Sequence, residues 1–149
     1  MKRYFFVIAL ISIILIIVKT VFSMFFGSNL VILKDNGSVK LNVDIAETPL
    51  ERTRGLMDVK NLPYGNGMLF IFEKSGYPEM WMKDTLIPLD MIFISGNFRV
   101  VDIKYAIPCR KDPCEIYKPI RESKYILEVN GNFTSEKGIE IGDRVNIYS

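Results

Sequence analysis

Hydrophobic and polar residues divide the chain into an apolar N-terminal segment and a longer body in which the two kinds alternate. Residues 5–18 are apolar except for Ser12, Lys19 and Thr20 interrupt the run, and residues 21–26 resume it. A membrane-spanning helix requires roughly 20 predominantly apolar residues, and residues 5–26 reach that length if Lys19 extends to the interface. The pattern predicts an N-terminal transmembrane helix within residues 1–28, followed by a globular domain over residues 29–149.

The basic start, Lys2-Arg3, favours a cytoplasmic N-terminus by the positive-inside tendency. The chain would then cross the membrane once, through residues 5–26, and carry its domain on the extracytoplasmic side. Two other interpretations stay open. The segment could be a cleaved signal peptide with a weak cleavage signal at Val21-Phe22-Ser23, or a buried soluble helix, although it is apolar on every face.

The body reads as a series of short strands. Residues 39–46 alternate between apolar and polar side chains, which is typical of a strand with one buried face. Asn36-Gly37 just before them is a strong tight-turn signal. Strands are predicted at residues 30–34, 39–46, 68–72, 80–83, 91–94, 98–106, 125–129 and 141–148, and residues 109–119 are predicted to form a proline-containing loop.

Helical signals are few. Thr48 can cap a helix in which Pro49 suits the first turn and Glu51 completes a capping box, and this helix is expected to run to Met57. Residues 132–137 allow one further helical turn. The predicted fold is therefore mainly β, a β-rich α+β domain of barrel-like shape with about eight short strands and one or two short helices.

Composition and charge exclude several classes of function. Hydrophobic residues make up 49% and charged residues 24%, as expected of a folded domain, and the net charge of +2 without a basic stripe argues against nucleic acid. The chain has no histidine, which excludes Ser-His-Asp and Cys-His catalytic units and imidazole zinc sites. We expect no metal and no cofactor, and whether the domain is an enzyme stays open.

Four blocks of residues resemble a known family. They are Glu51 with Arg54-Gly55-Leu56-Met57 and Gly67-Met68-Leu69-Phe70; Trp81-Met82-Lys83-Asp84-Thr85 with Pro88-Leu89-Asp90; Pro108-Cys109 with Asp112-Pro113-Cys114; and Tyr125-Ile126-Leu127-Glu128-Val129-Asn130-Gly131 with Gly142-Asp143-Arg144-Val145. Together they resemble the domain of unknown function 192 family of bacteria and archaea, over roughly residues 39–148. The resemblance implies a β-rich, barrel-like domain that often follows a signal peptide or anchor, but no established activity. Asp84 departs from the family pattern, which usually has Asn there.

Cys109 and Cys114 bracket four residues. Outside the cytoplasm so close a pair is expected to form a local disulfide, whose small loop would stabilise the fold only modestly. Free thiols, a redox pair or a soft-metal site are the alternatives.

A ligand site is predicted around Trp81, because polar groups beside an aromatic ring can line a concave binding site. Its proposed members are Arg54, Trp81, Lys83, Asp84, Thr85, Asp90 and Glu128. In the structural alternative, Trp81 fills the core while Lys83 pairs with Asp90. Arg54 could either clamp an anion or hydrogen-bond the last carbonyls of its helix, and the second role is favoured.

Asp90 and Glu128 are the carboxylate pair to consider for catalysis. If both faced one cleft, they could perform general acid-base chemistry or bind a cation. A structural role is favoured, in which a buried acid accepts backbone N–H bonds or pairs with Arg54 or Lys83. The sequence therefore predicts a membrane-anchored domain that binds a small polar ligand or an envelope glycan, or that serves an envelope protein as an accessory; the alternative is a carboxylate-dependent hydrolase using Asp90 and Glu128.

Overall fold

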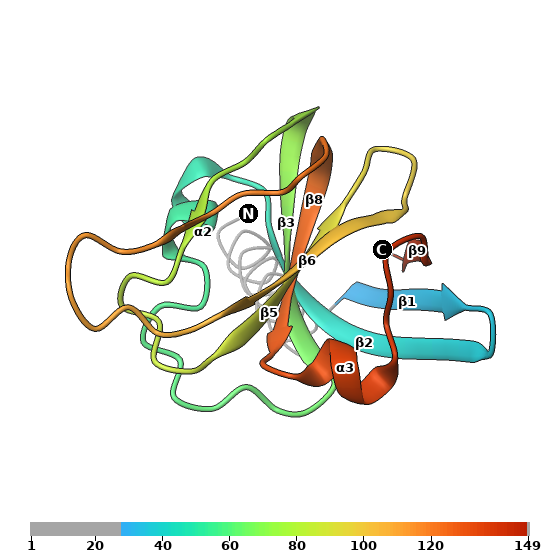
Figure 1. Cartoon of the computed structure of the whole chain (residues 1–149), viewed down its shortest axis with the longest axis horizontal. Coiled ribbons are helices and arrows are strands. Elements are labelled where there is room, and N and C mark those ends of the chain that lie inside the picture. The colour runs from blue at the N-terminus through green and yellow to red at the C-terminus, as the bar shows by residue number, and fades with distance from the viewer. Residues whose placement is uncertain (1–27, 149) are drawn as a thin grey trace, which may run out of the picture.

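A curled seven-stranded sheet is the main element of the computed structural model, which describes residues 28–148 (Figure 1). Within residues 28–148, a second sheet has two short strands, and two short helices lie outside the sheets. The strands are β1 (Ser28–Lys34), β2 (Gly37–Ala46), β3 (Asn66–Gly76), β4 (Met80–Trp81), β5 (Leu89–Ile94), β6 (Val100–Ala106), β7 (Ile116–Tyr117), β8 (Ser123–Asn130) and β9 (Arg144–Tyr148); the helices are α2 (Pro49–Arg54) and α3 (Phe133–Lys137).

The large sheet has the order β6-β5-β8-β3-β2-β1-β9. Its two edges approach each other at one end. Neighbouring strands are antiparallel except β2 and β3, whose parallel pairing requires the crossover that carries α2. Between the two edges, the Val100 N–H donates to the Asp143 carbonyl at 2.9 Å, and Arg99 forms an isolated bridge with Arg144. These contacts close one end of the sheet into a half-barrel.

The two faces of the large sheet bury separate cores. The first core takes at least one side chain from each of the seven strands, such as Leu69, Ile92 and Leu127, so it fills the inside of the curl, and Phe133 of α3 packs into it. The second core contains Phe70, Met91 and Ile126 together with side chains of β4 and β7. It lies on the outer face, beneath α2 and the small sheet.

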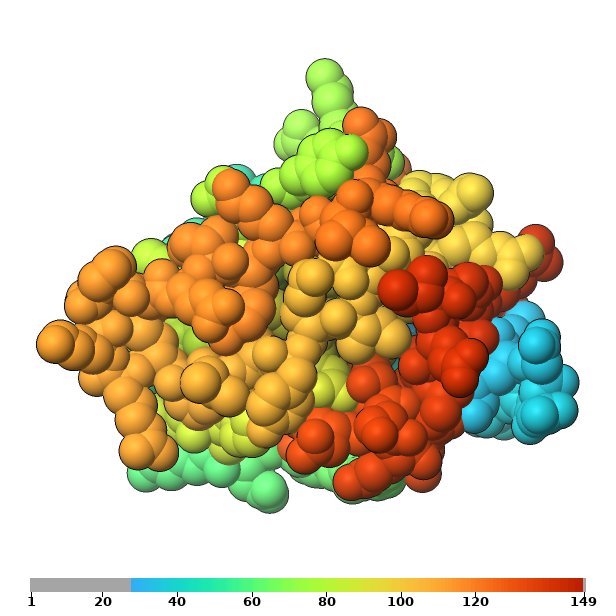
Figure 2. All heavy atoms as spheres, viewed as in Figure 1, coloured from blue at the N-terminus to red at the C-terminus, as the bar shows by residue number. Residues whose placement is uncertain are grey.

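The segment from β6 to β8 spreads over a large part of the face seen in Figure 2, where it is coloured orange. It contains β7, which pairs with β4 so that Trp81 lies opposite Ile116. The small sheet therefore forms an outer layer that partly covers the second core.

The predicted helix is confirmed at its start but not at its end. The Glu51 N–H donates to Thr48 Oγ1 at 3.3 Å and the Thr48 N–H donates to Glu51 Oε2 at 2.9 Å, which completes the predicted capping box. The helix stops at Arg54 rather than Met57, because Gly55 adopts a φ of +45° that L-residues with a side chain rarely take.

The mainly β prediction is confirmed, with differences at the strand ends. All eight predicted strands are present, and α3 falls where the helical turn was predicted. Residues 116–117 form β7 inside the predicted loop. Phe98 does not join β6, because a φ of +59° places it in the turn that precedes the strand.

The segment predicted to span the membrane, residues 5–26, lies outside the described residues. Over residues 28–148, no helix has both the length and the apolar character that a membrane span requires.

Candidate functional site

A pocket of about 400 Å³ opens on the outer face of the large sheet, between α2 and β4. β3 and β8 supply its base, and the chain after α2 supplies one wall. Five of the seven residues predicted as a ligand site line it: Arg54, Trp81, Lys83, Thr85 and Glu128. The structure thus brings together most of a set that is spread along 75 residues of sequence.

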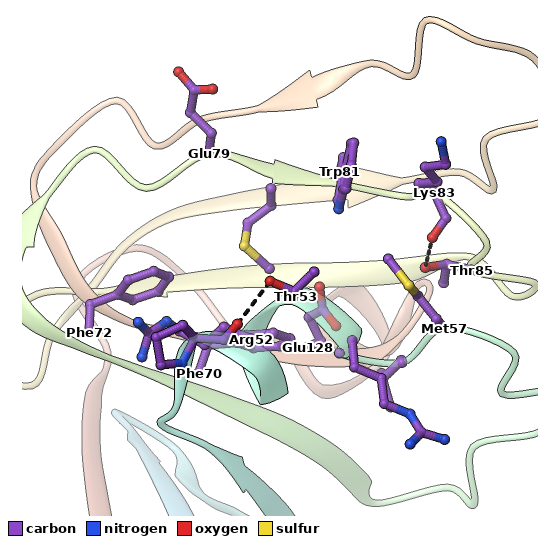
Figure 3. A pocket seen from close by; sticks show the side chains of 15 residues that line it. Arg52, Thr53, Met57, Phe70, Phe72, Glu79, Trp81, Lys83, Thr85 and Glu128 are labelled. Carbon is purple, nitrogen blue, oxygen red and sulfur yellow. Dashed lines mark hydrogen bonds between the residues drawn. The ribbon is translucent and has the colours of Figure 1, made fainter.

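Glu128 is the buried acid of this pocket. It is 4% exposed, and its carboxyl group points between Thr53 and Met57 toward the side where Trp81 lies (Figure 3). No residue of the described chain hydrogen-bonds that carboxyl group. Loss of hydration on burial raises the pKa of Glu128 to about 8. At pH 7 the side chain is therefore mostly an uncharged carboxylic acid, able to donate one hydrogen bond and accept others.

The strand pairing explains why Glu128 is dehydrated. β8 is a central strand, and Glu128 lies opposite Met68 of β3 and Met91 of β5. β3 can approach closely because Gly67 has no side chain: a Cβ there would lie 2.5 Å from the Glu128 carbonyl oxygen. The neighbours of the acid in the sheet are thus methionines that offer apolar surface and no strong hydrogen-bond donor.

Trp81 forms an exposed wall of the pocket. The residue is 44% exposed, and the Lys83 amino nitrogen lies 5.8 Å from the centroid of its ring. Lys83 also lies 3.9 Å from an Asp112 carboxylate oxygen. The alternative in which Trp81 fills the core and Lys83 pairs with Asp90 is therefore wrong, because Trp81 is nearly half exposed on the small outer sheet and the described ion pair of Lys83 is with Asp112.

Two arginines of α2 line the pocket, and only one was predicted. Arg52 donates to the Ile71 carbonyl at 3.0 Å and to the Glu47 carbonyl, and its guanidinium lies 5.2 Å from the centroid of Phe72. These bonds fix Arg52 against the sheet. Arg54 makes none of the expected bonds to helix carbonyls among the described contacts, and it is exposed at the pocket.

Thr53, Met57, Phe70 and Glu79 also line the pocket and were missed as site residues. Met57 and Phe70 stand within the blocks that carry the family resemblance, which was the signal that could have indicated them. The hydroxyl of Thr53 donates to the Pro49 carbonyl at 2.8 Å. Thr85, a predicted member, donates to the Lys83 carbonyl at 3.4 Å.

Asp90 lies away from the pocket, which corrects the predicted pairing with Glu128. Its carboxylate accepts bonds from the Asn132 N–H at 3.0 Å, the Thr134 N–H at 2.8 Å and the Thr134 hydroxyl at 2.6 Å. In the register of β5 and β8, Asp90 lies opposite Val129, a residue of the first core, whereas Glu128 faces the second core. The two acids point to opposite faces, so they form no common cleft, and the favoured structural role holds for Asp90.

Asp84 is the second predicted residue that the pocket does not include. It has a φ of +54°, and its carbonyl accepts a bond from the Asp58 N–H at 2.9 Å. Asn and Asp are the side-chain-bearing residues that adopt this left-handed conformation most readily. The turn therefore accommodates Asp in place of the usual Asn, and Asp84 supports the turn that leads to Thr85.

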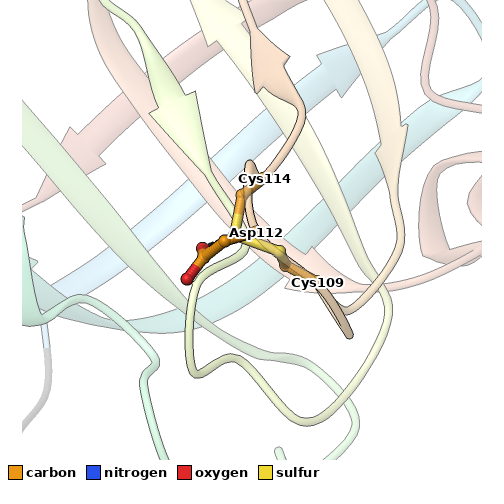
Figure 4. A group of neighbouring side chains, drawn as sticks. All are labelled: Cys109, Asp112 and Cys114. Carbon is orange, nitrogen blue, oxygen red and sulfur yellow. Dashed lines mark hydrogen bonds between the residues drawn. A yellow bond between two sulfur atoms is a disulfide. The ribbon is translucent and has the colours of Figure 1, made fainter.

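Cys109 and Cys114 are joined, with their sulfurs 2.10 Å apart (Figure 4). The Asp112 carboxylate lies near both sulfurs. With both sulfurs in the bond, neither is a thiolate, so this group lacks the ligands that a soft metal requires. The Cys109 N–H donates to the Met82 carbonyl at 3.3 Å, which attaches the loop to the residue that directly follows Trp81 and β4.

The fold and pocket define a class of small β-rich domains in which a half-barrel carries a ligand-sized pocket on its outer face. Within that class, the chain belongs to the DUF192 family of uncharacterized ACR proteins, whose model matches residues 31–147. The predicted resemblance is confirmed.

Similar proteins extend this result. The chain is 33% identical over 104 residues to a UPF0127 protein of Thermococcus sibiricus, covering 70% of this chain and 64% of that protein. It is 32% identical over 111 residues to a UPF0127 protein of Thermococcus kodakarensis, covering 74% of this chain and 65% of that one. The chain thus spans slightly less than two thirds of the length of these relatives.

Two crystal structures share the fold. One is of a protein from Sinorhizobium meliloti provisionally described as a transcription regulator, with a TM-score of 0.75 and 30% identity, covering 80% of this chain and 92% of that one. The other is of a protein of unknown function from Novosphingobium aromaticivorans, with a TM-score of 0.74 and 28% identity, covering 79% and 83% of the two chains.

Proposed function

We propose that the domain binds a small polar ligand in the pocket of Glu128 and Trp81. The observation that carries this proposal is the Glu128 carboxyl group, which is 4% exposed, points into the pocket and has no hydrogen-bond partner among the described residues. Burial of the carboxyl group removes hydration that no described residue replaces, and a ligand group bonded to it would offset that cost. A binding function gives this unfavourable placement a reason.

The shape and lining of the pocket support the same function. Its volume of about 400 Å³ lies within the range typical of small-molecule sites. The half-exposed ring of Trp81 offers a flat apolar surface on which a sugar ring can stack. A monosaccharide unit of an envelope glycan fits this combination of a flat wall and a hydrogen-bonding base. If residues 5–26 anchor the chain as predicted, the pocket would meet such a ligand outside the cytoplasm.

Thermal-shift and calorimetric titrations of the full chain test the proposal. The probes are D-glucose, N-acetyl-D-glucosamine, D-glucuronate, acetate and sulfate. Trp81→Ala should weaken binding of any sugar that raises the melting temperature. Tyr148→Ala removes a ring of comparable exposure, 53%, from β9 and should leave binding unchanged. Absence of binding by every probe, or equal loss in both variants, would count against the pocket as a ligand site.

A further inference from the structure

We infer that the pocket selects sugar acids: a neutral hydroxyl meets Glu128 at the base, and the carboxylate lies at the rim that Arg54 and Lys83 line. This inference rests on the proposed function and adds the chemical class of its ligand. It depends on how charge is distributed between the rim and the base of the pocket.

The rim carries an excess of positive charge. Arg52, Arg54 and Lys83 line the pocket together with one rim acid, Glu79. A Glu79 carboxylate oxygen lies 2.6 Å from the amino nitrogen of Lys118, which compensates its charge. The rim therefore attracts an anion, as clefts lined by one sign of charge do.

Arg54 and Lys83 are the rim cations best able to contact a ligand. Arg52 is already bonded to two carbonyls and lies against Phe72. The only described ion pair of Lys83 is with Asp112 at 3.9 Å, where the Asp112 side chain is 75% exposed. Such an exposed pair contributes little, so a ligand carboxylate can replace it without a large loss.

The base of the pocket requires an uncharged polar group. Glu128 is dehydrated between Met68 and Met91 and carries its proton at neutral pH. A ligand carboxylate placed there would lose its own hydration without a cation beside it, which is unfavourable. A hydroxyl can instead donate to and accept from the carboxylic acid. The ligand is thus oriented, with its neutral face inward and its acid outward.

The ring of Trp81 should make the pocket bind a sugar acid more tightly than a simple anion. Sulfate or acetate would meet only the rim cations, whereas a pyranose ring would also cover Trp81 and reach Glu128. All three parts of the pocket are used only by a molecule that combines a ring, hydroxyl groups and an anionic group.

D-glucuronate and D-glucose form a matched pair of probes, because they differ only in a carboxylate that replaces a hydroxymethyl group. In calorimetric titrations of the full chain at pH 6.5, D-glucuronate should bind about tenfold more tightly, as one charge-assisted hydrogen bond allows. High salt should reduce this preference, since the rim is accessible to ions. Arg54→Gln and Lys83→Met should each lower the affinity for D-glucuronate, whereas Lys40→Gln, an exposed change on β2, should not.

A second readout needs no ligand, because Trp81 is the only tryptophan of the chain. Iodide should quench its fluorescence more strongly in the wild type than in Lys83→Met at equal ionic strength, whereas caesium should quench the wild type less. Identical quenching in the two proteins would contradict a positive rim.

The outcomes distinguish this inference from the proposed function. Equal affinity for D-glucose and D-glucuronate would overturn the selection of acids and leave the binding function intact. If sulfate bound as tightly as D-glucuronate, the rim cations alone would account for binding, and this result would also overturn the inference. If neither sugar bound and sulfate did not bind either, both the inference and the proposed binding function would be contradicted.

Discussion

Asp90 and Glu128 lie one step apart on neighbouring strands, yet their carboxyl groups point to opposite faces of the sheet. Asp90 is opposite Val129, whose side chain belongs to the first core, and Glu128 is opposite Met91, whose side chain belongs to the second core. Each acid therefore points to the same face of the sheet as the residue opposite it. Asp90 is bonded by three donors near α3, and Glu128 is bonded by none of the described residues. One acid therefore holds the fold together, and the other is available to the pocket.

Replacing Glu128 by Gln should change how stability depends on pH. Burial raises the pKa of Glu128 from 4.5 to about 8, so between these values the unfolded chain has lost the proton that the folded chain keeps. The free energy of unfolding of the wild type should thus fall by up to about 1.4 kcal/mol per pH unit over this window and level off above it. Glu128→Gln lacks this slope and should be the more stable protein at pH 8.

Urea unfolding at pH 4, 5, 6, 7, 8 and 9 measures the effect. The advantage of Glu128→Gln should be small near pH 4 and grow with pH. Glu73→Gln, an exposed change on β3, serves as the control and should stay within about 0.5 kcal/mol of the wild type. Parallel stability curves for the wild type and Glu128→Gln would contradict a protonated Glu128.

Asp90→Ala should destabilise the fold. The change leaves the Asn132 and Thr134 amides and the Thr134 hydroxyl without their acceptor, and Thr134 is buried. A loss of about 3 kcal/mol is expected in denaturant unfolding, because the orphaned donors keep their desolvation cost. Amide hydrogen exchange should accelerate at residues 132 and 134 in particular. Asp44→Ala, an exposed change on β2, is the matched control; equal effects of the two changes would exclude this role for Asp90.

The strands were predictable because alternation of side chains is a local property. Val39 to Ala46 shows the pattern without reference to any other part of the chain, and the helix start at Thr48 is likewise encoded within four residues. β7 lacks such a signal, because two residues within a proline-containing loop are too few to show a period. It forms only because β4 supplies its partner.

Part of the site could be predicted from residues that are neighbours in sequence, whereas Arg54 and Glu128 were indicated by the blocks of the family resemblance. Trp81, Lys83 and Thr85 alternate along one short segment, and all three line the pocket. The separation of Asp90 from Glu128 depends on the register between β5 and β8, and a shift of one residue would reverse it. The exposure of Trp81 depends in the same way on the pairing of β4 with a distant strand.

Gly67→Ala tests the close packing behind Glu128. An added Cβ would lie 2.5 Å from the Glu128 carbonyl oxygen, which is backbone of a central strand and has little room to move. We expect a loss of about 2 kcal/mol or more in the free energy of unfolding. Gly76→Ala is the control on the same strand, since nothing lies within 4 Å of its added Cβ, and it should be neutral or slightly stabilising. A neutral Gly67→Ala would mean that β3 and β8 are less closely packed than described.

Reduction of the disulfide should loosen one wall of the pocket more than it weakens the fold. Cys109 and Cys114 are separated by 5 positions, and closing so small a loop contributes about 2 kcal/mol in the chain-entropy model. The same loop is bonded to the Met82 carbonyl through the Cys109 N–H and brings Asp112 close to Lys83. A phosphine reductant should therefore lower the unfolding free energy by roughly that amount and change the fluorescence of Trp81 under native conditions.

The double change Cys109→Ser with Cys114→Ser should reproduce both effects and make the protein insensitive to the reductant. Complete unfolding on reduction, or a Trp81 signal that stays constant while stability falls, would contradict this link between the loop and the pocket wall.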